Sequence, residues 1–151
     1  MVVYLDTSSL LKLYVEEEGR EIVRDAVRSA EVAVTSTIAY AEARAGLARR
    51  VREGDFTDEE HGRAVKRLDE EWLGYDRQAV SNAVAYHAGE LAERHALRGY
   101  DSVHLASAVR LSERFGDLRF LAFDDRLNDA ARAAELAVYG DESRAGLEAD
   151  G

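Results

Sequence analysis

The chain has 151 residues and no cysteine, a length that suits one domain with a substantial core. Disulfides, thiolate metal sites and cysteine nucleophiles are therefore excluded. The formal net charge of −10, from 30 acidic and 20 basic residues, argues against coating nucleic acid by bulk attraction, but it allows local contact through a metal ion and a few arginines. There is neither a leader-like N-terminus nor an apolar run of membrane length, so we expect a cytoplasmic protein without membrane contact.

The first residues predict a strand that ends in a carboxylate. Residues 2–5 are a short apolar run, typical of a strand buried on both faces, and Asp6, Thr7 and Ser8 then lead into an apolar helical pattern over 10–15. Asp6 therefore lies where an α/β sheet presents polar groups to ligands, at its carboxyl edge. The same residue also suits a helix cap, and Asp6 taken alone favours the capping interpretation.

The rest of the chain alternates short strands with helices. Strands are predicted at 32–35, within 75–80, at 118–123 and at 136–139, and helices at 20–30, 37–53, 57–73, 81–96, 101–114 and 126–135. Thr57 and Glu60 predict a capping box at the start of the helix at 57–73. This order predicts an α/β three-layer sandwich around a central parallel sheet of about five strands. Residues 1–139 form this single domain, and we expect the acidic tail at 140–151 to be loosely ordered.

Acidic residues stand at several of the predicted element boundaries. Asp101 opens a helix, and Asp124 follows the strand at 118–123, so Asp124 and Asp6 both lie at the carboxyl ends of parallel strands. Glu42 has apolar neighbours on its helix, where a carboxylate is either paired, with Arg49 as the candidate, or bound to a ligand. Converging carboxylates repel each other unless they take up protons or a divalent cation, and oxygen ligands suit Mg²⁺ or Mn²⁺. Spacing alone does not establish that these acids converge.

Four sequence blocks carry a family resemblance. They are Asp-Thr-Ser-Ser-Leu at 6–10, Thr-Ser-Thr-Ile-Ala-Tyr-Ala-Glu at 35–42, Gly-Tyr-Asp-Ser-Val-His-Leu-Ala-Ser-Ala at 99–108, and Phe-Leu-Ala-Phe-Asp-Asp-Arg-Leu at 120–127. In this order they resemble the signature blocks of PIN-domain nucleases, and within that family the VapC-type toxins of toxin–antitoxin pairs. The third block is the most specific, and the match spans nearly the whole chain.

The resemblance implies a metal-dependent endoribonuclease with Mg²⁺ as cofactor, for which Mn²⁺ can substitute. Its catalytic and metal-binding acids would be Asp6, Glu42, Asp101 and Asp124, with Asp6 and Asp101 as the principal ligands. The doubled acid leaves Asp125 open as the alternative fourth residue. The resemblance also implies an RNA substrate, a cognate antitoxin protein and a homodimer.

Other residues near these acids have two interpretations each. The hydroxyls of Thr7, Ser8 and Ser36 either steady the ligands or cap helices. His104 shares a helix face with Asp101 and either assists proton transfer or is a hydrogen-bonded core histidine, which we favour. Arg49 belongs to a basic run over 44–52 that either holds RNA phosphates or is a solvated face.

Two further function classes fit a sheet of this kind. A non-catalytic PIN-like module would act through protein contacts, and the presence of all four acids argues against it. Another Mg²⁺-dependent phosphate enzyme is the third hypothesis. A haloacid-dehalogenase-type phosphatase needs a second Asp where Ser8 stands, and a response-regulator receiver needs an acid pair near the first strand and a lysine after the last core strand.

Overall fold

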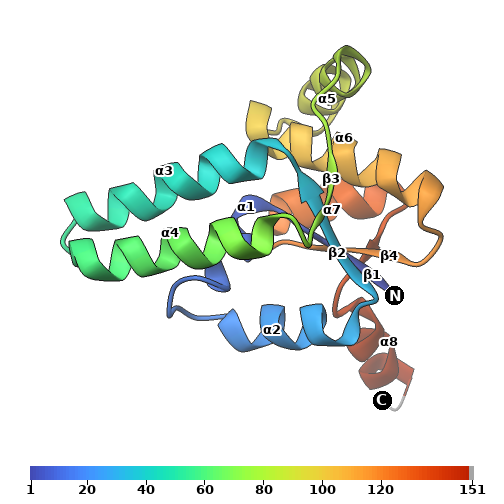
Figure 1. Cartoon of the computed structure of the whole chain (residues 1–151). Helices are drawn as coiled ribbons and strands as arrows, with labels where there is room; N and C mark the ends of the chain where they lie inside the picture. Colours follow the sequence, from blue (N-terminus) through green and yellow to red (C-terminus); the bar gives the residue numbers. More distant parts are fainter. Residues whose placement is uncertain (150–151) are drawn as a thin grey trace.

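The computed structural model describes residues 1–149, and a parallel sheet runs through the middle of it (Figure 1). The five strands lie in the order β3-β2-β1-β4-β5. Their bounds are β1 Val2–Leu5, β2 Val32–Ser36, β3 Asp76–Gln78, β4 Leu118–Leu121 and β5 Ala137–Val138. In the register of the central strands, Val3 pairs with Ala33 on β2 and with Arg119 on β4. The predicted parallel α/β sheet is thus confirmed.

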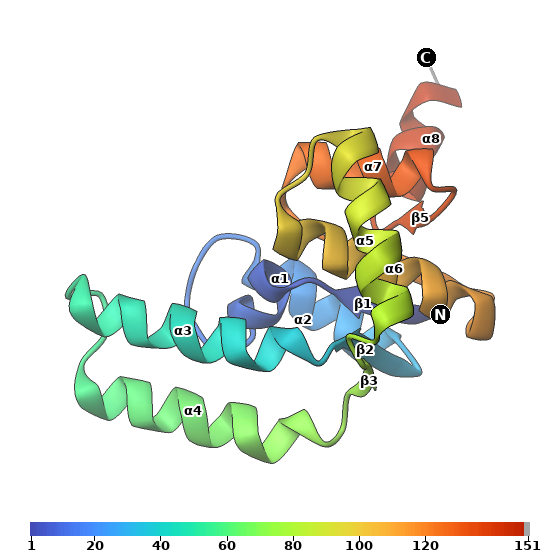
Figure 2. The same ribbon diagram turned by 90° about the horizontal axis from the view of Figure 1, so that it is seen from above.

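Helices cover both faces of the sheet. Their bounds are α1 Thr7–Lys12, α2 Arg20–Ser29, α3 Ile38–Arg52, α4 Asp58–Trp72, α5 Asn82–His95, α6 Gly99–Arg114, α7 Asp125–Ala133 and α8 Asp141–Ala149. Helices α3 and α4 run side by side and project beyond the sheet in both views (Figures 1 and 2). The capping box predicted at the start of α4 is present, formed by Thr57 and Glu60. No helix in residues 1–149 combines the length and apolarity needed to cross a membrane.

The central strand β1 is apolar throughout because each of its faces packs against a separate core. Val3 and Leu5 join the core beneath α1 to α4, whereas Val2 and Tyr4 join the core beneath α5, α6 and α7. Residues of a strand alternate between its faces, so this division follows directly from the period of two. The ring of Tyr4 stacks on Phe120 of β4, with 5.4 Å between the ring centroids.

The end of β4 and the start of α6 differ from the sequence-based expectations, and both differences change where acidic residues lie relative to these elements. Strand β4 ends at Leu121, so our expectation that Asp124 directly follows the strand was wrong. Residues 122–123 intervene, and Asp124 instead caps α7 by accepting a hydrogen bond from the Leu127 amide at 2.9 Å. Helix α6 begins at Gly99, which places Asp101 within its first turn.

The chain after Gly140 was expected to be loosely ordered, whereas the structure has helix α8 there. Two arginines of the main domain hold its first residues. Arg132 makes two hydrogen bonds to the Asp141 carboxylate, both 2.8 Å, and Arg119 donates to Glu142 at 2.6 Å. Residues 150 and 151 of the predicted tail lie outside the described residues.

Candidate active site

Asp6 leaves the carboxyl end of β1 and begins α1. Its Oδ1 accepts the backbone N–H of Ser9 at 2.9 Å, and the Ser8 hydroxyl donates to both carboxylate oxygens at 2.9 and 3.0 Å. Asp6 is therefore the N-cap of α1, as its capping interpretation predicts, and Ser8 hydrogen-bonds to its carboxylate. Only 5% of Asp6 is exposed, and burial raises the pKa of its carboxyl group despite these hydrogen bonds. A nearby positive charge would therefore stabilise the ionised form of the Asp6 carboxyl group.

Glu42 projects from α3 into a hydrogen-bond network that spans several elements. The Thr7 hydroxyl donates to Glu42 Oε1 at 2.6 Å, and His104 Nε2 lies 2.9 Å from both Glu42 Oε1 and Thr7 Oγ1. The second ring nitrogen, His104 Nδ1, lies 2.8 Å from the Tyr4 hydroxyl. With a proton on Nε2, His104 donates to Glu42 Oε1 and Thr7 Oγ1, while Nδ1 hydrogen-bonds to the Tyr4 hydroxyl.

This network shows what Glu42 pairs with and where His104 lies. His104 is 2% exposed and is the hydrogen-bonded core histidine that we favoured, yet it also contacts a candidate catalytic acid. Burial raises the pKa of Glu42, but the hydrogen bonds from His104 and Thr7 outweigh burial and hold it below its ordinary value. The proposed pairing with Arg49 was wrong. Arg49 is 70% exposed and pairs with Glu53 one turn further along α3, at 3.0 Å.

The remaining acids share a pocket with two arginines. A cavity of about 430 Å³ is lined by Asp101, Asp124 and Asp125 together with Arg98 and Arg126. Arg98 Nε lies 3.5 Å from the Asp101 carboxylate, whose side chain is 28% exposed. Three carboxylates and two guanidinium groups therefore face one open space. Because Asp124 and Asp125 both line it, the pocket does not decide between them as the fourth acid.

The donor chemistry of this edge suits a hard divalent cation, although the acids do not form a preformed cage. In residues 1–149, no three acidic or histidine side chains come together closely enough to hold a metal ion unaided. Mg²⁺ usually takes only one or two protein carboxylates and keeps several waters, so oxygen ligands such as Asp6 and Asp101 still fit it. Within residues 1–149 the Ser36 hydroxyl makes no hydrogen bond to an acidic side chain. It accepts the Ile38 amide at 3.3 Å, one residue before the N-cap of α3, Thr37.

Two residues of this edge went unnoticed in the sequence. Tyr4 lies in an apolar run and gave no polar signal, because its phenol matters only once His104 reaches it from α6. Arg98 lies between the helices predicted at 81–96 and 101–114, where it gave no functional signal. Its proximity to Asp101, three residues on, follows from the first turn of the helix starting at Gly99.

Comparison with known proteins agrees with this description. The family model of the PIN domain matches residues 3–133. Ribonuclease VapC45 of Mycobacterium tuberculosis (strain CDC 1551 / Oshkosh) is 36% identical over 137 residues, which cover 91% of this chain and 94% of that protein. The chain therefore belongs to the PIN-domain family. Within the family, it is similar over nearly its whole length to a VapC ribonuclease, as the four sequence blocks had indicated.

Solved structures show the same fold at lower sequence identity. The crystal structure of FitAcB from Neisseria gonorrhoeae superposes with a TM-score of 0.68 at 21% identity, covering 93% of this chain and 97% of that chain. A toxin–antitoxin complex from Klebsiella pneumoniae superposes with a TM-score of 0.57 at 17% identity, covering 82% and 87%. The PIN-like architecture is thus shared across this chain and both structures.

The low pKa of Glu42 predicts a pH-dependent contribution to stability. A carboxyl group whose folded pKa lies below its unfolded value stabilises the fold above the unfolded pKa, near 4.5, and loses this contribution as the pH falls through the folded pKa. In EDTA, the Glu42→Gln variant should therefore be less stable than wild type at neutral pH. The difference in unfolding free energy, measured by urea titration, should shrink below about pH 4.5. An equal difference from about pH 3.5 to 7 would contradict the assigned hydrogen bonds.

Proposed function

We propose that this protein is a VapC-type endoribonuclease, the toxin of a toxin–antitoxin pair, which hydrolyses RNA phosphodiester bonds with the help of Mg²⁺ or Mn²⁺. The observation that carries the proposal is the presence of all four family acids on the carboxyl-edge elements of a PIN-family chain. Asp6 follows β1, Glu42 lies on α3 after β2, and Asp101 shares a pocket with Asp124. The full-length similarity to ribonuclease VapC45 supports the same activity.

In this proposal, Asp6 and Asp101 are the principal ligands of the cation, and Asp124 completes the site directly or through water. A bound divalent ion lowers the pKa of water and stabilises the negative charge that develops on a phosphate under in-line attack. Asp6 is suited to this role because burial raises the pKa of its carboxyl group, so a bound cation would offset the cost of keeping its negative charge buried.

Glu42 is the residue best suited to accept the proton of the attacking water. Hydrogen bonds from Thr7 and His104 fix one of its oxygens, Oε1, and so orient the carboxylate. Within residues 1–149 the second oxygen, Oε2, makes no hydrogen bond, which leaves it to the water. His104 itself is buried and acts in this scheme by holding Glu42 in place.

Arg98 and Arg126 provide local positive charge on a chain that is acidic overall. Both line the pocket that contains Asp101 and Asp124. Arg126 Nη1 donates to the Ala96 carbonyl at 3.3 Å, which helps to fix its position beside the acids. Guanidinium groups bind phosphate oxygens well, so these two side chains are suited to the phosphates that flank the cut.

The partners follow from the same assignment. We expect a cognate antitoxin, in keeping with the toxin–antitoxin complex from Klebsiella pneumoniae that shares the fold. We also expect a homodimer and a cytoplasmic location, where the RNA substrate and the antitoxin would be found. Dimerisation is measurable directly by sedimentation equilibrium on the purified chain.

Removing one charge from the site tests the nuclease assignment. Asp101→Asn keeps the side-chain shape but removes a proposed ligand charge, and loss of several kcal/mol of transition-state stabilisation corresponds to at least about a 100-fold fall in cleavage rate. The measurement is cleavage of a labelled mixed RNA pool in Mg²⁺ or Mn²⁺, with an EDTA control. The matched control is Asp25→Asn, which removes a carboxylate on α2 whose ion pair within residues 1–149 is with Arg28 on the same helix.

Two results would contradict this assignment. Cleavage by Asp101→Asn at the wild-type rate would show that the site is misplaced. Absence of cleavage by wild type with any divalent ion, across total cellular RNA, would favour a PIN module that acts through protein contacts alone.

Removing the charge of Arg126 should weaken RNA binding more than it slows the chemical step. We expect Arg126→Gln to raise KM several-fold with a smaller change in kcat, and to lower the salt-dependence slope of RNA binding by about 1. The control is Arg28→Gln, whose exposed guanidinium lies on α2. An unchanged KM and an unchanged salt slope would remove Arg126 from the RNA-binding surface.

A further inference from the structure

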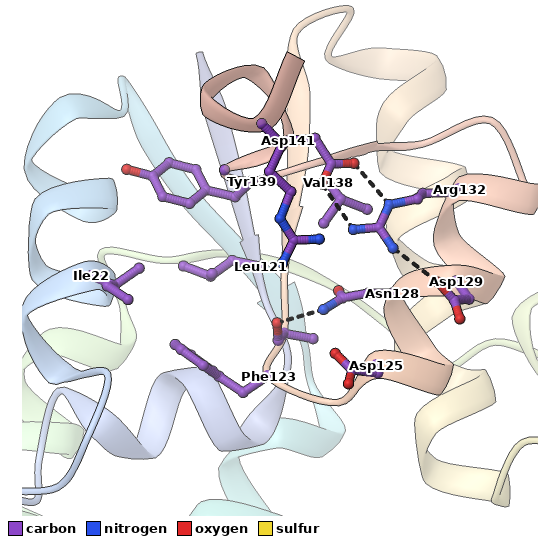
Figure 3. A pocket seen from close by; sticks show the side chains of 13 residues that line it. Ile22, Leu121, Phe123, Asp125, Asn128, Asp129, Arg132, Val138, Tyr139 and Asp141 are labelled. Atoms are coloured by element: carbon purple, nitrogen blue, oxygen red, sulfur yellow. Dashed lines mark hydrogen bonds and ion pairs between the residues drawn. The ribbon is translucent and has the colours of Figure 1, made fainter. Parts of the chain in front are cut away.

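A second, larger cavity adjoins the acidic pocket. It has a volume of about 630 Å³ and lies between the carboxyl ends of β4 and β5, helix α7, and residues of α2 and α8 (Figure 3). Asp125 lines both cavities. A strand of RNA whose phosphate lies beside Asp101 and Asp124 would therefore have a neighbouring nucleotide at the mouth of this second space.

The cavity has two chemically different walls. Ile22, Leu121 and Phe123 lie on one side in Figure 3, and the polar side chains of Asp125 and Asn128 lie on the other. Phe123 is 40% exposed and Ile22 is 50% exposed, so these apolar groups border open space in addition to the core. An apolar wall facing a polar one suits a flat heteroaromatic ring, which stacks on one side and forms hydrogen bonds along its edge.

The amide of Asn128, on the polar side of the cavity, determines whether a ligand must offer donors or acceptors to it. Its Nδ2 donates to the Ala122 carbonyl at 2.9 Å, which fixes the amide orientation because the flipped form would set two oxygens against each other. Its Oδ1 is shielded from solvent and has no hydrogen-bond partner within residues 1–149. A shielded acceptor without a donor is unfavourable, so a ligand that brings an N–H group to Asn128 would be stabilised there.

The charges in the cavity argue against a phosphate as the occupant. Three carboxylates, from Asp125, Asp129 and Asp141, line it together with two guanidinium groups, from Arg132 and Arg144. Arg132, one of the two, is already bound to Asp141 by two hydrogen bonds of 2.8 Å and to Asp129 at 3.0 Å. The cavity is therefore better matched to hydrogen-bond donors than to an anion.

We propose that this cavity binds one base of the RNA strand, next to the phosphate that is cut, and that it selects bases with an exocyclic amino group, guanine above all. This inference rests on the proposed function. Guanine presents two adjacent donors, N1–H and the amino group, to the acceptors of Asn128 and Asp125. Uracil presents a single N–H between two carbonyl oxygens, which a carboxylate repels, and it is the least favoured base.

Cleavage of a randomised single-stranded RNA pool tests this selection. Sequenced cut sites of wild type should show a preference for guanine over uracil at one position adjoining the cut. Asn128→Leu should reduce that preference about threefold to tenfold, the value of one net hydrogen bond, while cleavage of uracil-containing sites changes little. Asn82→Leu, at an exposed position of α5, is the matched control. Thermal unfolding establishes that each variant is folded.

A binding measurement keeps this test separate from the nuclease activity. RNA carrying 2-aminopurine, an amino-bearing fluorescent base, is titrated with the protein in EDTA. Wild type should quench the fluorescence by stacking, and Phe123→Leu should lose most of this quenching because it keeps an apolar side chain but no ring.

Two outcomes overturn the proposal. One is cleavage without base preference beside the cut, or a preference that survives in folded Asn128→Leu. The other is fluorescence that does not respond to wild type, or that responds equally to Phe123→Leu. Quenching without any cleavage would instead support the base site and contradict the nuclease assignment.

Discussion

The hydrogen-bond chain from Tyr4 through His104 to Glu42 is the constraint on which the site depends. It links the central strand β1 to α6 and then to α3, so it crosses between the two helical layers at the carboxyl edge of the sheet. Each buried member would be costly to leave unpaired, which makes the arrangement close to all-or-none. A slip of one residue in the register of β1 would turn Tyr4 to the opposite face and break the chain. The register of β1 is therefore coupled to the position of the Glu42 side chain.

Two carboxylates at this edge, buried Asp6 and half-buried Glu42, are held in opposite electrostatic conditions. Burial dominates at Asp6 and raises its pKa, whereas hydrogen bonds from His104 and Thr7 dominate at Glu42 and lower its pKa. A cation near Asp6 would therefore stabilise its ionised form. At Glu42, hydrogen bonds from the protein itself already stabilise the ionised form. Under the proposed function, this difference suits Asp6 to hold a cation and Glu42 to orient the attacking water.

The sequence predicted the sheet, the order of the elements and the capping box of α4, because those features depend on local periodicity and on turn and cap residues. It missed what depends on contact between distant segments. Arg49 was taken as the partner of Glu42 by helical spacing, but Glu42 turns inward to His104, which is 62 residues away. Asp124 was placed at the end of β4, although the strand ends at Leu121. The first residue of α8, Asp141, is held by Arg132 of α7. Local sequence patterns do not predict this ion pair.

Binding of Mn²⁺ to the purified chain, followed by electron paramagnetic resonance, tests the central claim most directly, because it needs neither the RNA target nor the antitoxin. The account predicts saturable binding by wild type and by Asp25→Asn, and binding weakened at least about tenfold in Asp6→Asn and in Asp101→Asn. Binding of equal strength in all four proteins, or no binding by wild type, would contradict a divalent-metal site at the carboxyl edge of the sheet.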